Sequence, residues 1–112
     1  MKLVGIEKSR VYVTVDIIDY MANSVVSKTI LMKTTGNVTV ISFDAGQGKA
    51  EKTSPFDTLV QVIEGQAEII IDGEIVLLAI GESIIIPANT SNRINANVRL
   101  KMIQTIIKSG YE

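Results

Sequence analysis

The sequence lacks two residue types on which much of catalytic and metal-binding chemistry depends. None of its 112 residues is His or Cys. This excludes an imidazole base, a Ser-His or Cys-His nucleophile pair, a thiolate and a disulfide. Zinc, copper and haem sites normally need one of these residues, so they are close to excluded as well. What remains is Lys, Tyr and carboxylate chemistry, together with oxygen ligands for hard cations.

The charged residues give no sign of a nucleic-acid or membrane partner. Eleven basic and 12 acidic residues leave a net charge of −1, and there is no basic run. Charges such as Lys2, Glu7 and Asp16 interrupt the N-terminal region, which has no apolar stretch of signal-peptide length. Nothing elsewhere approaches a membrane-spanning length. We therefore expect a cytoplasmic protein with no nucleic-acid and no membrane partner.

The elements that must position these side chains are β-strands. The hydrophobic residues, 46% of the chain, are dominated by Ile and Val, whose branching at Cβ favours sheets over helices. Short apolar runs separated by turn residues are typical of a sandwich or barrel. We expect one domain over residues 1–112, with strands at residues 11–20, 25–33, 38–43, within 47–57, 58–63, 66–71, 74–79, 83–86, 92–96 and 98–107.

Three sequence signals mark turns between these strands. Asp72-Gly73, between two apolar runs, is the strongest hairpin signal in the chain. Gly36-Asn37 predicts a second hairpin turn. Pro87 ends the strand before it, because proline cannot donate to a β-ladder.

Two sets of spaced residues resemble the signature motifs of the cupin superfamily of small β-barrels. The first set, within residues 46–65, is Gly46, Lys52, Ser54, Thr58 and Gly65. The second set, within residues 81–96, is Gly81, Pro87, Asn89, Asn92 and Ala96. The resemblance extends over roughly residues 25–107 and is that of a small single-domain, type 2-like cupin. It implies an all-β fold, the cupin-type double-stranded β-helix or jelly-roll barrel.

The resemblance also implies where a metal would be bound, and the sequence departs from the family there. The positions of the two His and the Glu of the first motif, and of the His of the second, hold Lys52, Ser54, Thr58 and Asn92. An ammonium group repels a dication, and hydroxyl and amide groups are weak neutral ligands. We therefore predict a metal-free cupin without a cofactor. The family's metal-dependent dioxygenase, oxidase and decarboxylase activities are not carried over.

The turn residues of the two motifs make a conformational prediction. Gly65 and Gly81 lie where tight turns need positive φ, which glycine adopts at little steric cost. Asn89 replaces a family glycine, and Asn is the residue next most tolerant of that conformation. We expect the left-handed conformation at all three.

The four residues at the metal positions are the candidate ligand-binding site. Period two places Lys52 and Ser54 on one face of a strand. The resemblance implies that this face looks into the barrel, together with Thr58 and Asn92. In one interpretation Lys52 is the counter-ion of a small anionic or hydrogen-bonding molecule. In the other it reaches the barrel mouth and stays solvated.

Other polar residues near the motifs each have two interpretations. Glu51 and Asp57 flank the cluster and could serve as acid or base, or could lie solvated near turns. Gln61 is either a polar group of the pocket or an edge or interface residue. Arg93 could clamp a carboxylate, or could lie at the surface.

The larger apolar residues are assigned to the core or to the pocket wall. These are Phe43, Phe56, Met32 and Met102. The runs EIIIDG and SIIIPA are apolar on both faces, which implies that something covers the outer face of the barrel. We expect a homodimer to which the strand at residues 11–20 contributes, with Tyr12 and Tyr20 as contacts.

The sequence therefore predicts a homodimeric, metal-free cupin that binds a small polar or anionic ligand and catalyses no reaction. One alternative is a metal-independent isomerase or lyase acting on a sugar or carboxylate, with Lys52 assisted by Glu51 or Asp57. Another is a barrel that has lost its ligand and serves as a structural or regulatory partner. The identity of the ligand stays open.

Overall fold

The computed structural model describes residues 6–109, which form nine strands and one short 3-10 helix. No helix in that part of the chain is long and apolar enough to cross a membrane. The elements are η1 (Thr14–Asp16), β1 (Val25–Lys33), β2 (Gly36–Phe43), β3 (Gly48–Thr53), β4 (Thr58–Glu64), β5 (Gln66–Ile71), β6 (Glu74–Ala79), β7 (Ser83–Ile86), β8 (Ser91–Asn95) and β9 (Leu100–Ile107).

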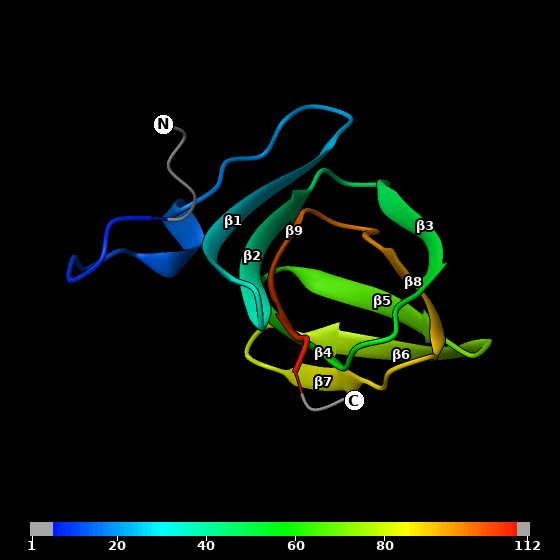
Figure 1. Cartoon of the computed structure of the whole chain (residues 1–112). Coiled ribbons are helices and arrows are strands. Elements are labelled where there is room, and N and C mark those ends of the chain that lie inside the picture. The colour runs from blue at the N-terminus through cyan, green and yellow to red at the C-terminus, as the bar shows by residue number, and fades with distance from the viewer. Residues whose placement is uncertain (1–5, 110–112) are drawn as a thin grey trace.

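The strands form two antiparallel sheets whose inner faces are opposed (Figure 1). The larger sheet has the order β1-β2-β9-β4-β7, and the smaller has the order β3-β8-β5-β6. Both sheets join strands that are far apart in the sequence, since β2 pairs with β9 and β3 pairs with β8. This architecture confirms the predicted all-β jelly-roll barrel.

Turn chemistry explains several of the strand boundaries. Asp72 and Gly73 have φ values of 47° and 83° and close the β5–β6 hairpin, as a type I′ turn requires. Gly65, Gly81 and Asn89 have φ values of 79°, 82° and 63°, so the predicted left-handed conformations are confirmed. The first hairpin differs by two residues from its prediction: residues 34 and 35 form the turn, because pairing of β1 with β2 places Gly36 opposite Lys33.

The core lies between the two sheets. Phe43 and Met102 are fully buried, which confirms their assignment to the core. The other buried members of the cluster are all aliphatic: Ile41, Val60, Val62, Ala67, Ile69, Leu78, Ile86, Ile94, Ala96 and Leu100. The inner face of each sheet can therefore be traced through these residues, because side chains alternate along a strand and cross-strand partners share a face.

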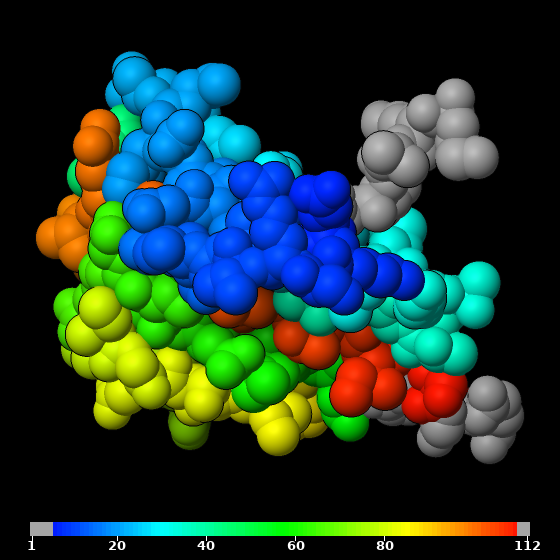
Figure 2. All heavy atoms as spheres, turned by 90° about the vertical axis from the view of Figure 1, so that its left-hand side faces the viewer, coloured from blue at the N-terminus to red at the C-terminus, as the bar shows by residue number. Residues whose placement is uncertain are grey.

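The prediction of a strand at residues 11–20 is wrong. This segment is irregular around η1 and lies across the outer face of the larger sheet, where Figure 2 shows it over β2, β9 and β4. Side chains of the sheet hold its backbone: Lys101 Nζ donates to Val15 O at 2.6 Å, and Ser42 Oγ donates to Asp19 O at 2.8 Å. β-branched residues favour extended structure, but a segment becomes a strand only where it can pair with the edge of a sheet. At the edge of β1 the backbone hydrogen bond comes from Ile6, whose N–H donates to Ile30 O.

The two tyrosines of this segment make contacts within the chain. The Tyr20 hydroxyl donates to the Glu64 carboxylate, and its ring lies 4.8 Å from the Arg99 guanidinium carbon. Burial, followed by the hydrogen bond to Glu64, raises the pKa of Tyr20 above its usual value. The Tyr12 hydroxyl accepts from the Glu7 N–H at 3.1 Å. Their predicted role at a dimer contact stays a prediction.

Candidate functional site

The inner face of the smaller sheet brings Lys52 and Asn92 together. They are direct cross-strand partners of β3 and β8. Asn92 alternates with Ile94, which is buried in the core, so both members of the pair belong to the inner face. The two motifs therefore meet here, as the resemblance implied.

Asn92 is buried and partly used by its own sheet. Its Nδ2 donates to Lys52 O and to Thr90 O, both at 3.4 Å. Both bonds use the nitrogen of the carboxamide, and together they orient the group. Lys52 differs because it is exposed, which keeps its ammonium group in contact with water.

The other two candidate residues lie elsewhere on the frame. Thr58 begins β4 in the larger sheet and alternates with the core residue Val60, which places it on the opposing inner face. Ser54 follows the end of β3 and stabilises a turn: its Oγ accepts from the Phe56 N–H at 3.2 Å, and its carbonyl accepts from the Asn89 N–H at 2.6 Å. Lys52 and Ser54 therefore do not share a strand face as period two predicted, because the strand has already ended at Thr53.

Lys49 is a second cation on the inner face, and sequence reasoning missed it. It pairs with Ile94, one of the core residues. A register shift lies between Lys49 and Lys52, so an extra residue in β3 brings both lysines to one face. Strict alternation would separate two residues at this spacing. Burial, followed by the charge of Lys52, lowers the pKa of Lys49 below its usual value.

Gln104 places a further polar group inside the barrel. It is buried at 7% exposure and pairs with Val60 and Thr39, so it belongs to the inner face of the larger sheet. The Thr39 hydroxyl lies 3.3 Å from that of Thr29 on the neighbouring strand. Amide and hydroxyl groups thus come from the larger sheet, and two cations and an amide come from the smaller. The sequence alone does not indicate which face of β9 carries Gln104, because this polar residue lies within a run of β-branched residues.

The two carboxylates that flank the cluster in the sequence make hydrogen bonds of their own. The Glu51 carboxylate accepts a hydrogen bond from the Ser91 hydroxyl on the outer face of the smaller sheet. The Asp57 Oδ1 accepts from the Ala88 N–H at 2.8 Å. Gln61 and Arg93 are exposed on strand faces opposite the core. These contacts give Glu51 and Asp57 structural roles at strand ends.

Two of the residues assigned to the core or pocket wall lie near the surface. Met32 is 52% exposed beside the β1–β2 turn, so its assignment to the core is wrong. It stands at the end of a strand, where alternation continues but the opposing sheet no longer covers the side chain. Phe56 is half-buried, and the Lys108 ammonium lies 6.0 Å from its ring centre.

The side chains at the four family metal positions do not fit a metal ion. Lys52 is a cation, the Ser54 hydroxyl accepts a hydrogen bond within a turn, and Thr58 and Asn92 offer only a neutral hydroxyl and a neutral carboxamide. Within residues 6–109 no three His, Cys, Asp or Glu side chains gather into a group that could hold one. The side chains at these positions can donate and accept hydrogen bonds, and Lys52 adds a positive charge.

Two opposed antiparallel sheets closed around a core, with polar groups on the inner faces, define a double-stranded β-helix barrel. No family model and no curated protein matches the sequence. Among solved structures, it is similar to a conserved protein of unknown function from Streptococcus pyogenes, with a TM-score of 0.88, 28% identity and 96% of both chains covered.

Two further solved structures that are similar to this chain are cupins. A cupin superfamily protein from Desulfitobacterium hafniense has a TM-score of 0.87 and 23% identity over 96% of this chain and 98% of that one. A cupin 2 conserved barrel domain protein from Leptotrichia buccalis has a TM-score of 0.81 and 27% identity over 84% of this chain and 46% of that one. The chain accordingly has the fold of these small cupin barrels.

Proposed function

We propose that this cupin binds a small polar or anionic organic molecule inside its barrel, without a metal and without catalysing a reaction. The observation that carries the proposal is the pairing of Lys52 with Asn92 on the inner face. A cation next to a carboxamide provides charge and hydrogen bonds to an anionic ligand. Thr58, on the opposing inner face, adds a hydroxyl.

The enzyme alternative has less support. A metal-independent isomerase or lyase would need an acid or base beside Lys52. The two carboxylates considered for this role, Glu51 and Asp57, are bonded to Ser91 and to the Ala88 N–H. A ligand-free structural or regulatory barrel is the remaining alternative, and the cytoplasmic location stays a prediction from the sequence.

A binding experiment separates these alternatives. Native protein is incubated with a mixture of sugars, sugar acids and organic acids, and bound compounds are identified by native mass spectrometry. We expect at least one compound to bind the wild type and to be lost in Lys52→Ala. Lys28→Ala is the matched control, because Lys28 is exposed on the outer face of β1. Binding that survives Lys52→Ala would refute the proposed site, and absence of any bound compound would favour the structural barrel.

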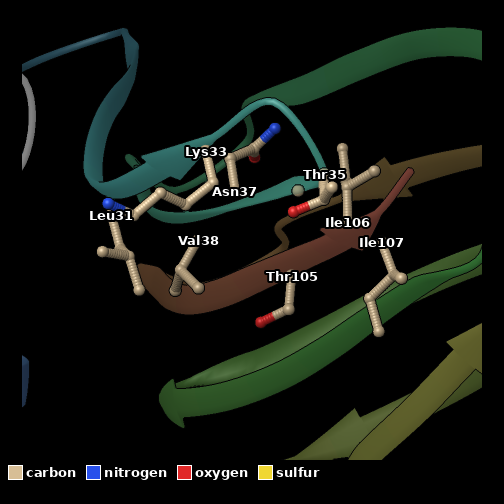
Figure 3. A pocket seen from close by; sticks show the side chains of 9 residues that line it. Leu31, Lys33, Thr35, Asn37, Val38, Thr105, Ile106 and Ile107 are labelled. Atoms are coloured by element: carbon tan, nitrogen blue, oxygen red, sulfur yellow. The ribbon is translucent and has the colours of Figure 1, made fainter. Parts of the chain in front are cut away.

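We also propose a homodimer formed through the outer face of the larger sheet. One cross-strand row crosses all five strands of this sheet, and we call it the outer row: Leu31, Val38, Thr105, Leu59 and Ile85. Figure 3 shows Leu31, Val38 and Thr105 side by side along it. A hollow of about 200 Å³ lies beside these residues. Leu31 and Ile85, at the two ends of the row, are 45% and 63% exposed, and exposed apolar side chains of this size are typical of an interaction surface.

The oligomeric state tests this second proposal. We expect wild-type protein to sediment as a dimer at micromolar concentration and Ile85→Asp to shift it toward monomer. Ile75→Asp is the matched control, because Ile75 is 65% exposed on the smaller sheet and Ile85 is 63% exposed. A monomeric wild type, or equal dissociation of both variants, would contradict the proposed surface.

A further inference from the structure

The two lysines of the inner face have no acidic partner among residues 6–109. The ion pairs found there join Arg10 with Glu7 and Arg99 with Asp44. Lys49 and Lys52 take part in neither pair. Within residues 6–109, the ammonium groups of Lys49 and Lys52 on the inner face of β3 therefore have no carboxylate as an ion-pair partner.

Two carboxylates of the smaller sheet, Glu51 and Glu74, are unsuited to neutralise them. Glu51 lies on the opposite face of β3 and is bonded to Ser91. Glu74 belongs to the same cross-strand row as Lys52, but on β6, three strands away. At a strand spacing of about 4.8 Å this separates the two backbones by roughly 14 Å. Neither carboxylate therefore forms an ion pair with the lysines among residues 6–109.

We propose that Lys49 and Lys52 together bind the doubly charged group of a small organic anion, a phosphate monoester or a dicarboxylate, on the inner face of β3. This inference rests on the proposed function, because it names the class of molecule that the barrel binds. Each lysine is a point charge with three rotatable donors, which suits a group with several equivalent oxygens. A single carboxylate would leave one ammonium unpaired.

The surroundings of the pair support a charged group over a neutral one. Lys49 is half-buried, and burial and the charge of Lys52 both lower its pKa, so its ammonium form is disfavoured in the empty barrel. A dianion removes both causes at once, since it replaces lost hydration and screens the repulsion. Asn92 on β8 and Gln104 on β9 are neutral amides, which orient a ligand without competing for the cations.

Isothermal titration calorimetry at constant ionic strength tests the inference with four probes. Inorganic phosphate and malonate carry two charges, acetate carries one and glycerol none. We expect phosphate or malonate to bind at least about tenfold more tightly than acetate, and glycerol not to bind. Comparison of phosphate with malonate distinguishes the two sources of the dianion.

Charge-neutral variants show whether both lysines take part. We expect Lys49→Gln and Lys52→Gln each to weaken dianion binding by at least about tenfold, Lys49→Arg to retain it, and Lys28→Gln to leave it unchanged. Removal of a half-buried unpaired charge does not threaten folding, and circular dichroism of each variant checks this.

The outcomes separate this inference from the proposed function. Equal affinity for acetate and malonate, or loss of binding in Lys52→Gln but not in Lys49→Gln, would overturn the two-lysine site and leave a Lys52 pocket standing. Binding of a neutral compound from the metabolite mixture, with no binding of the dianions, would do the same. Failure of the probes and of the whole mixture to bind would overturn both.

Discussion

The turn between β4 and β5 is predicted to accept no side chain at position 65. Gly65 has a φ of +79°, and a Cβ built on it would lie 2.0 Å from Arg99 O, just before β9. Real Cβ contacts are essentially never shorter than 3.0 Å. In Gly65→Ala the turn would therefore have to move by about 1 Å from a backbone segment that is itself fixed by the pairing of β9 with β4.

The magnitude follows from a comparison with Gly73. That residue has a φ of +83°, but a Cβ added there would meet nothing within 4 Å. The left-handed conformation costs an alanine about 1–2 kcal/mol at either site. Forcing the turn away from the backbone of β9 adds about 1–3 kcal/mol at Gly65 alone, by analogy with overpacked sites. We therefore expect the free energy of unfolding of Gly65→Ala to lie below that of Gly73→Ala by this additional amount of about 1–3 kcal/mol.

Thermal and urea unfolding of the two variants measure this difference. For a domain of this size about 1 kcal/mol corresponds to roughly 4–8 °C, so Gly65→Ala should unfold at least about 4 °C below Gly73→Ala. The denaturant m-value should be unchanged, because the same surface is exposed on unfolding. Equal midpoints for the two variants would refute the claim that contact with Arg99, and not φ alone, requires glycine at position 65.

Other perturbations follow from the contacts of Tyr20, Asp44 and Lys49. Tyr20→Phe removes the hydrogen bond to Glu64 and should lower the free energy of unfolding in urea by about 0.5–1.5 kcal/mol; no change would show that the bond contributes nothing net. The N–H of Asn23, then Arg99, lower the pKa of Asp44 below 3.8, so its stabilisation is present above that pH and lost as the pH falls through the folded-state pKa. Asp44→Asn should therefore flatten the stability profile below about pH 4, and an unaltered acid limb would contradict this. The lowered pKa of Lys49 disfavours its charged form in the fold, so Lys49→Gln should raise the thermal midpoint at pH 7 and lose this advantage as the pH approaches 10.5. Elemental analysis of protein purified without chelator should find no stoichiometric transition metal, and a full equivalent would overturn the metal-free assignment.

The features that sequence reasoning predicted correctly depend on local chemistry. The sequence predicts a strand at residues 25–33, where β1 lies, because β-branched alternation and turn residues act over a few positions. Asn89 was expected in the left-handed conformation and has a φ of 63°. The resemblance to the cupin motifs also implied that Lys52 and Asn92 lie on one face, and they pair although β3 and β8 are far apart in the chain.

The features that it missed depend on non-local pairing. Residues 11–20 have the composition of a strand, yet whether they pair is decided by which segment reaches the edge of β1. Lys49 was overlooked because the register shift in β3 is set by its partner β8, and a single strand read with period two puts Lys49 and Lys52 on opposite faces. Ser54 was misplaced for the related reason that alternation was extended past the end of the strand at Thr53.

The frame of the barrel and its chemistry rest on different residues. The core cluster contains none of the four residues at the family metal positions, and the turns depend on positive φ at sites such as Gly65 and Asn89. Replacement of the side chains at these four positions therefore leaves the packing and the turns intact. Lys49 differs from these frame residues. Its half-buried charge has no acidic partner among the described residues, so it destabilises the protein when no ligand is bound. Such a cost is typical of binding sites, where the ligand supplies the missing charge, and a barrel with a purely structural role would gain stability from a neutral residue at position 49.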